Sequence, residues 1–131
     1  MKKRVFCLAL VAILCLSVAS TSLASVISPR QAFGSSSMSS TGRTVSFAGY
    51  SSSAQIEDVI GVTITLWELR GSTWYKVGGA SKEIQNGDYV STTGSQTVTG
   101  GYYYKVTGTH YSQKDGKSYS VTSETASKWI P

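Results

Sequence analysis

Residues 60–69 read IGVTITLWEL, and in this stretch apolar and polar side chains alternate with a period of two. The apolar side chains that fall on one side of an extended chain are Ile60, Val62, Ile64 and Leu66. The other side carries Thr63, Thr65 and Trp67. Because successive side chains of a strand point to opposite faces of a sheet, the stretch predicts a strand with one buried face.

The same period recurs on both sides of this strand. Further strands are predicted in RTVSFAG (43–49), SQTVTG (95–100), YYYKVTGTHY (102–111) and KSYSVTSE (117–124). These stretches are rich in Val, Thr and Tyr, and the Gly, Asn and Asp between them leave no window long enough for a helix. The chain is therefore predicted to be all-β.

Three turn sequences predict that neighbouring strands run antiparallel. Asn-Gly at 86–87 and Asp-Gly at 115–116 are dipeptides that accept the positive φ angles of a type I′ hairpin. Arg-Gly-Ser at 70–72 reverses the chain after the first strand quoted above. Centring the hairpin on 115–116 pairs His110 with Val121. Hairpins at this spacing indicate an antiparallel sandwich or a small barrel.

The stretch GGYYYKVTG, which begins at Gly100, resembles the start of strand F in immunoglobulin-like sandwiches. In that pattern a Tyr follows the Gly after one residue, and an inward core residue, often Cys, follows the Tyr after one more. The resemblance covers about residues 43–127 and implies an antiparallel immunoglobulin-like β-sandwich of the immunoglobulin and fibronectin type III class. It implies that Tyr102 makes the corner hydrogen bond to upstream backbone, that Tyr104 fills the core in place of the Cys, and that Tyr103 is exposed.

The layout as a whole is similar to a family of small secreted proteins of Gram-positive bacteria whose function is unknown. The similar features are an N-terminal export signal, SPRQA just after it, IGVTITLWE followed by a turn and STWYKV, and GGYYYKVTG followed by a hairpin that contains Gly. This resemblance implies a secreted β-sandwich and supplies no activity.

The first 25 residues, MKKRVFCLALVAILCLSVASTSLAS, have the basic, apolar and small-residue order of a secretory signal peptide. We predict a signal peptide over 1–24 with cleavage after Ala24, a flexible Ser- and Gly-rich lead-in over 25–42, and one domain over 43–131. An uncleaved anchor is the alternative, although the apolar run is shorter than the roughly 20 residues of a membrane span. The mature protein is expected outside the cell and off the membrane. Any attachment to the cell wall would be noncovalent, since no anchoring tail follows SKWIP.

Cleavage would change the charge and the chemistry of the chain. Three of its 12 Lys and Arg residues lie in the first four positions, so 12 minus 3 leaves nine basic against seven acidic residues. A basic pI is then no evidence for a nucleic-acid partner. Cys7 and Cys15 would also leave with the signal, which excludes disulfides and thiolate metal sites from the mature domain.

No residue pattern predicts catalysis, a metal site or a cofactor. His110, the single histidine, lies on the inward side of its strand, where a structural role is expected. The many serines form neither a Gly-x-Ser-x-Gly elbow nor a Ser-x-x-Lys pair. The chain is therefore predicted not to be an enzyme, and a secreted hydrolase is the least favoured function.

Aromatic side chains are more numerous than so small a core can bury. We selected Trp67, Tyr103, Trp74 and Tyr111 as candidate ligand-binding residues, because rigid rings provide contact area at low entropy cost. The alternative is that these rings only form stabilising cross-strand pairs. The sequence thus predicts a non-enzymatic binding domain or a structural component of the envelope or matrix, whose partner would be a cell-wall glycan or a surface protein. A carbohydrate-binding module is the second candidate.

Overall fold

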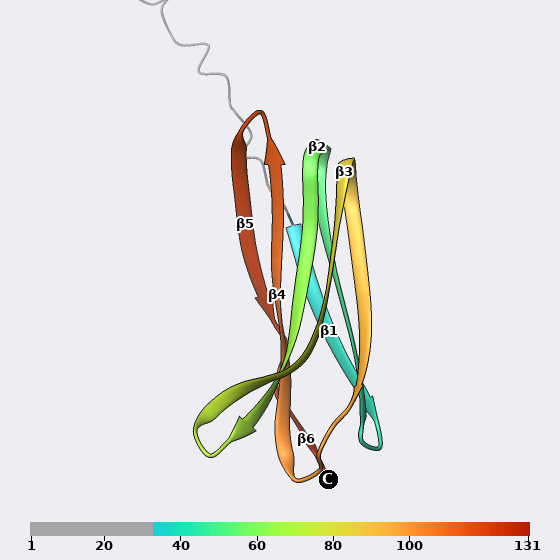
Figure 1. The fold of residues 1–131 in the computed structure, drawn as a ribbon, viewed down its shortest axis with the longest axis vertical. Coiled ribbons are helices and arrows are strands. Elements are labelled where there is room, and N and C mark those ends of the chain that lie inside the picture. The colour runs from blue at the N-terminus through green and yellow to red at the C-terminus, as the bar shows by residue number, and fades with distance from the viewer. Residues whose placement is uncertain (1–32) are drawn as a thin grey trace, which may run out of the picture.

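The computed structural model describes residues 33–131, and within them every regular element is a strand. The strands are β1 (Phe33–Thr41), β2 (Thr44–Arg70), β3 (Thr73–Thr97), β4 (Tyr102–Lys114), β5 (Lys117–Glu124) and β6 (Lys128–Ile130) (Figure 1). All pairings are antiparallel, which confirms the all-β antiparallel prediction. The predicted signal peptide and its cleavage site lie outside the described residues.

Two long strands, β2 and β3, pass through both halves of a single curled sheet. Residues 44–52 of β2 pair with β1 and with residues 89–97 of β3, whereas residues 59–69 pair with β4 and with earlier residues of β3. The register between β2 and β3 shifts between Ser52 and Glu57, where β2 turns over at the top of Figure 1. We call β1 with 44–52 and 89–97 the first half of the sheet, and 57–70 and 73–87 with β4, β5 and β6 the second half.

The two halves lie face to face and enclose the core between them. A Cβ atom added to Gly49 in the first half would lie 2.5 Å from Cγ2 of Ile64 in the second. At the β1 edge, the hydroxyls of Ser36 in β1 and Ser123 in β5 lie 2.8 Å apart, although these two strands are not paired. The fold is therefore sandwich-like, with the sheet bent over on itself.

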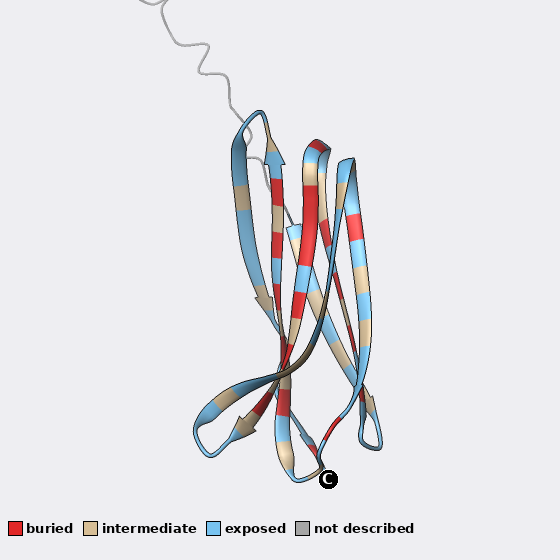
Figure 2. Cartoon of the chain, viewed as in Figure 1, coloured by how far each residue is buried: buried red, intermediate tan, exposed pale blue. Residues whose placement is uncertain are grey.

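The core follows the predicted two-residue period. Its buried apolar residues are Val45, Phe47, Ile60, Val62, Ile64, Leu66, Val90, Val98, Tyr104, Val106 and Ile130 (Figure 2). The predicted buried face of 60–69 and the predicted core position of Tyr104 are thus correct. The predicted pairs of the 115–116 hairpin, including His110 with Val121, are also confirmed.

The N-terminal boundary of the folded region was predicted wrongly. Residues 33–41, part of the expected flexible lead-in, form β1 and pair with β2 along nine residue pairs. Every second residue of β1 is half-buried. Because those residues are mostly Gly and Ser, the strand carries almost no apolar period, and this is why its sequence resembled a linker.

The Asn-Gly hairpin expected at 86–87 is also absent. Strand β3 runs without interruption from Thr73 to Thr97, and Asn86 uses its positive φ of 54° to bend β3 where β2 bends beside it. The other two turns are as predicted: Gly71 has a φ of 62°, and the hairpin at 115–116 has positive φ at both positions. The Asn-Gly dipeptide therefore marks a change of direction, but the change is a bend within strand β3 and not a turn between two strands.

Within the tyrosine run, two of the three roles are confirmed and one is wrong. Tyr104 is fully buried and Tyr103 is 45% exposed, as expected. The hydroxyl that bonds to upstream backbone belongs to Tyr104, whose Oη lies 2.5 Å from the carbonyl oxygen of Thr99. Tyr102 instead packs, half-buried, against the edge of the core. Val121, opposite the buried His110, is 41% exposed at the open edge of the sheet.

Candidate functional site

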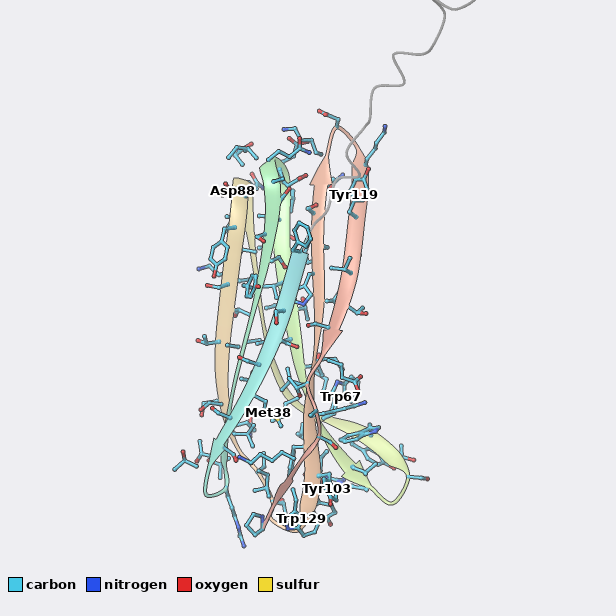
Figure 3. The ribbon with its side chains drawn as sticks, turned by 180° about the vertical axis from the view of Figure 1, so that it is seen from behind. Met38, Trp67, Asp88, Tyr103, Tyr119 and Trp129 are labelled. Atoms are coloured by element: carbon cyan, nitrogen blue, oxygen red, sulfur yellow. The ribbon has the colours of Figure 1, made fainter. Side chains whose placement is uncertain are left out.

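Three of the four candidate binding residues gather on the outward face of the second half of the sheet. Leu69 of β2 lies directly opposite Tyr103 of β4 on one side and Trp74 of β3 on the other, and Trp67 precedes Leu69 by two residues on the same face. Trp129 of β6 lies opposite Tyr103. We call Trp67, Trp74, Tyr103 and Trp129 the aromatic cluster; it lies beside the β2–β3 hairpin (Figure 3).

The outer part of the aromatic cluster is open to solvent. Tyr103 and Trp129 are 45% and 49% exposed. Their rings meet edge to face, with centroids 5.2 Å apart and planes at 63°. Such a pair contributes roughly 0.5–1.5 kcal/mol beyond its buried area, so the two rings hold one another in place while they remain accessible.

The inner part of the cluster is held by polar contacts. The indole Nε1 of Trp67 donates to Oγ1 of Thr107 at 2.8 Å, and Trp67 is half-buried. The Nζ of Lys105 lies 4.5 Å from the centre of the half-buried Trp74 ring and 3.2 Å from a carboxylate oxygen of Glu124. These contacts fix both tryptophans, which therefore serve the fold as well as the surface.

Tyr111 is not part of this cluster. It lies opposite Gly61, six residues along β2 from Trp67, which corresponds to about 20 Å along a strand. The Tyr111 hydroxyl donates to the carboxylate of Glu83 on β3, and its ring crosses Gly61, where any side chain would overlap it. The hydrogen bond to Glu83, together with burial, raises the pKa of Tyr111 to about 12. Tyr111 thus forms a cross-strand contact that stabilises the sheet.

Sequence reasoning missed two aromatic groups. The first is Trp129, because the three-residue strand that carries it, β6, is too short to show an alternating pattern. Tyr50 and Tyr89 lie on the outward face of the first half of the sheet, with near-parallel rings 5.9 Å apart. Their positions become neighbours only through the bend of β3.

A buried carboxylate lies beneath the aromatic cluster, on the inward face. Glu68 is 3% exposed, accepts a hydrogen bond from the Tyr104 hydroxyl at 2.6 Å and forms an ion pair with Arg70 at 2.5 Å. Burial alone would raise the pKa of Glu68, but the Tyr104 hydrogen bond and the Arg70 guanidinium outweigh it and hold the pKa below its ordinary value. For Tyr104, burial and the bond to Glu68 raise the pKa. The carboxylate therefore stays ionised and fixes the start of strand β4.

His110 is fully buried between the two halves, as its inward position predicts. Its Nδ1 lies 3.2 Å from Oγ of Ser51, and its Nε2 lies 2.7 Å from Oγ of Ser123. Burial lowers the pKa of His110, and a hydrogen bond with the backbone of Tyr50 offsets part of this effect. The ring is therefore neutral at pH 7 and joins β1, β2, β4 and β5 through serine hydroxyls.

Within residues 33–131, no three His, Cys, Asp or Glu side chains lie close enough to hold a metal ion. The same part of the chain contains no helix that could span a membrane.

Comparison with known proteins assigns no family to the chain. No family model matches the chain, and no curated protein matches it. Among solved structures, the solution structure of CsgH from R. palustris aligns with a TM-score of 0.44 and 6% identity, over 72% of this chain and 90% of that one.

Proposed function

We propose that this protein is a secreted, non-enzymatic binding domain that recognises a protein partner through its aromatic cluster. The observation that carries the proposal is the pair Tyr103 and Trp129, about half exposed at the outer part of a cluster whose other two rings are anchored. Tyr and Trp are enriched at the energetic centres of interfaces, where rigid rings are buried by a partner.

The arrangement of the rings favours a protein over a glycan as the partner of this cluster. The planes of Tyr103 and Trp129 stand at 63° to one another, so the pair offers one face and one edge rather than a shared flat surface. A sugar ring stacks on a flat aromatic face, whereas the uneven surface of a protein can fill the angle between two rings. A carbohydrate-binding module that uses Trp67, Tyr103 and Trp74 remains the second candidate.

Two features support a non-enzymatic role. His110, the single histidine, is fully buried, with serine hydroxyls against both ring nitrogens, so it cannot reach a substrate. The buried carboxylate of Glu68 is already occupied by Tyr104 and Arg70. General acid–base catalysis needs a group within hydrogen-bond reach of a substrate.

The arrangement of the strands supports the finer proposal of an immunoglobulin-like sandwich. Residues 57–70, β4 and β5 would correspond to strands C, F and G of that class, and the opposite half would supply A, B and E. The order differs from the seven-stranded constant type because residues 73–87 pair with the C position instead of joining the other half.

Secretion rests on the signal peptide predicted over residues 1–24. Mass spectrometry of the culture medium should find a chain that begins at or near Ser25 and has no free thiol. Recovery of the protein only from membranes, with Met1 intact, would contradict this part of the proposal.

The binding role can be tested with one variant and one matched control. Purified mature protein would be incubated with solubilised surface proteins of the producing cell, and the bound proteins identified and titrated. Tyr103→Ser should weaken retention of the partner at least fivefold, about 1 kcal/mol. The protein should stay folded, with the free energy of unfolding lowered by about the 0.5–1.5 kcal/mol of the lost ring pair. Tyr75→Ser removes a ring of similar exposure, 46%, on the opposite face of the β2–β3 hairpin and should bind as the wild type does. Equal binding by all three proteins would contradict the proposal.

A further inference from the structure

The outward face of the first half of the sheet is lined almost entirely by hydroxyl groups. The register of β1 with β2, and of β2 with β3, places the outward side chains in rows of three. The Ser and Thr residues in these rows are Ser35, Ser37, Ser39, Thr41, Thr44, Ser46, Ser52, Ser91, Thr93, Ser95 and Thr97. The other members of the rows are Phe33, Ala48, Tyr50 and Tyr89, so none of the side chains in these rows is charged.

This face is hollowed by two adjoining depressions. The larger, about 520 Å³, lies among Ser39, Ser46 and Ser95, and the smaller, about 180 Å³, lies beside Tyr50 and Tyr89. They have Ser37, Ala48 and Thr93 in common. Together they form one open groove, which we call the hydroxyl groove. From Tyr50 to Ser46 it covers four residues of β2, or about 14 Å along the strand.

Two tyrosine rings close one end of the hydroxyl groove. Tyr50 and Tyr89 are 40% and 53% exposed, and their planes differ by only 24°. The near-parallel rings thus form an open aromatic surface at the point where the groove reaches them. This arrangement differs from the aromatic cluster, where Tyr103 and Trp129 meet edge to face.

We propose that the hydroxyl groove is a second binding site, and that its ligand is a neutral polysaccharide strand. Ser and Thr hydroxyls both donate and accept hydrogen bonds, as sugar hydroxyls do, so a row of them can match a polyhydroxylated chain in several registers. The Tyr50 and Tyr89 rings supply the apolar surface on which the C–H face of a sugar packs.

Charge and composition argue against other occupants of the hydroxyl groove. Neither depression is lined by an Asp, Glu, Lys, Arg or His residue, so the groove offers no partner for an acidic or a basic polymer. The centre of a protein–protein interface is usually apolar and aromatic. The outward side chains along the larger depression are instead Ser, Thr and Ala48, although the inward residues Met38, Phe47 and Gly94 also contribute to its lining. The site lies on the opposite side of the molecule from the aromatic cluster and does not depend on it.

The test uses the mature chain and four defined polysaccharides. Binding of the wild type to insoluble cellulose, xylan, mannan and chitin would be measured by depletion from solution, with cross-linked polygalacturonate as the acidic comparison. Two groove variants, Tyr89→Ser and Thr93→Arg, remove the open ring and place a long charged side chain in the groove. Tyr75→Ser on the β2–β3 hairpin, outside both the hydroxyl groove and the aromatic cluster, is the matched control, and the unfolding midpoint of each variant shows that it folds.

We expect at least one neutral polysaccharide to bind the wild type, and its Kd to rise tenfold or more in both groove variants while Tyr75→Ser binds as the wild type does. Failure of all four neutral polysaccharides to bind would overturn the proposal, and so would equal binding to polygalacturonate. Binding that survives both groove variants, or that is lost in Tyr75→Ser, would place the site elsewhere. The aromatic cluster is tested by retention of a protein partner and the hydroxyl groove by binding of a polysaccharide. The two proposals can therefore fail separately.

Discussion

Tyr104 contributes to stability through its hydroxyl as well as its ring. Replacement by Phe keeps the buried ring but removes the bonds to Glu68 and to the Thr99 carbonyl. A hydrogen bond to a charged group contributes about 1.5–3 kcal/mol, so Tyr104→Phe should lower the free energy of unfolding by about that amount at pH 7. Tyr103→Phe removes the hydroxyl of an exposed ring and should change the free energy of unfolding by less than about 0.5 kcal/mol. Urea titrations of the two variants provide the comparison.

The pH dependence of the Tyr104→Phe effect follows from Glu68. Because the pKa of Glu68 is lowered in the folded state, its ionised form stabilises the fold above the ordinary pKa, and this stability is lost as the pH falls through the folded pKa. The difference between wild type and Tyr104→Phe should therefore narrow below about pH 4. A difference that stays constant from pH 7 to pH 3 would mean that the hydroxyl acts only on the Thr99 carbonyl.

We expect a second pH effect from His110, caused by burial of the ring rather than by a charged partner. Its pKa is lowered by burial, so below the ordinary value of about 6.5 the unfolded chain takes up a proton that the folded chain does not. Stability should be unaffected by this group above that pH and should fall by up to about 1.4 kcal/mol per pH unit below it. Urea midpoints between pH 7.5 and 5.5 should show this slope in the wild type and not in His110→Gln.

At the level of single elements, β1 depends on one small residue. A Cβ atom at Gly34 would overlap the ring of His110, so Gly34→Ala must push β1 away from the core or displace the histidine. Such overpacking costs roughly 1–3 kcal/mol. Ser35→Ala on the outward side of the same strand should cost less than about 0.5 kcal/mol. Equal effects in thermal unfolding would show that β1 is not docked as described.

The strands that could be predicted are those whose apolar side chains meet the core. The stretch 60–69 and the hairpin at 115–116 carry their own period and turn residues, so their faces and register follow from local chemistry. Strand β1 could not be found because its inward residues, Gly34 and Ser36 among them, are small so that His110 and Ser123 can fit against them. Both of these contact residues, His110 and Ser123, lie more than 70 residues away from Gly34 and Ser36 in the sequence.

The candidate site was predicted by type of residue rather than by position. Outward parity identified Trp67 and Tyr103, and the surplus of rings pointed to Trp74, but only the registers around Leu69 bring these residues together. The same surplus included Tyr111, which the register places about 20 Å away. The hydroxyl groove could not be foreseen at all, since serine-rich strands and serine-rich linkers have the same composition.

For the molecule as a whole, the continuity of β2 and β3 predicts a single unfolding transition. All three tryptophans, Trp67, Trp74 and Trp129, lie in the second half of the sheet, so their fluorescence reports on that half, whereas circular dichroism reports on every strand. Phe47→Ala, a core change in the first half that should cost about 3–5 kcal/mol, is expected to shift both signals equally. A fluorescence midpoint that stays in place while the dichroism midpoint moves would show that the halves unfold separately.

The positions of the two ends of the described chain give the fold a mechanical property. Phe33 begins β1 toward one end of the long axis, and Pro131 lies at the other, directly after β6 (Figure 1). Tension applied between these two points would pull β1 lengthwise along β2 and β6 lengthwise along β4. Because the bonds between antiparallel strands lie perpendicular to the strands, such a pull loads the bonds of the nine β1–β2 residue pairs together instead of opening them one after another. The domain is thus built to resist stretching along its length, and the three residue pairs of β6 are expected to yield before β1 does.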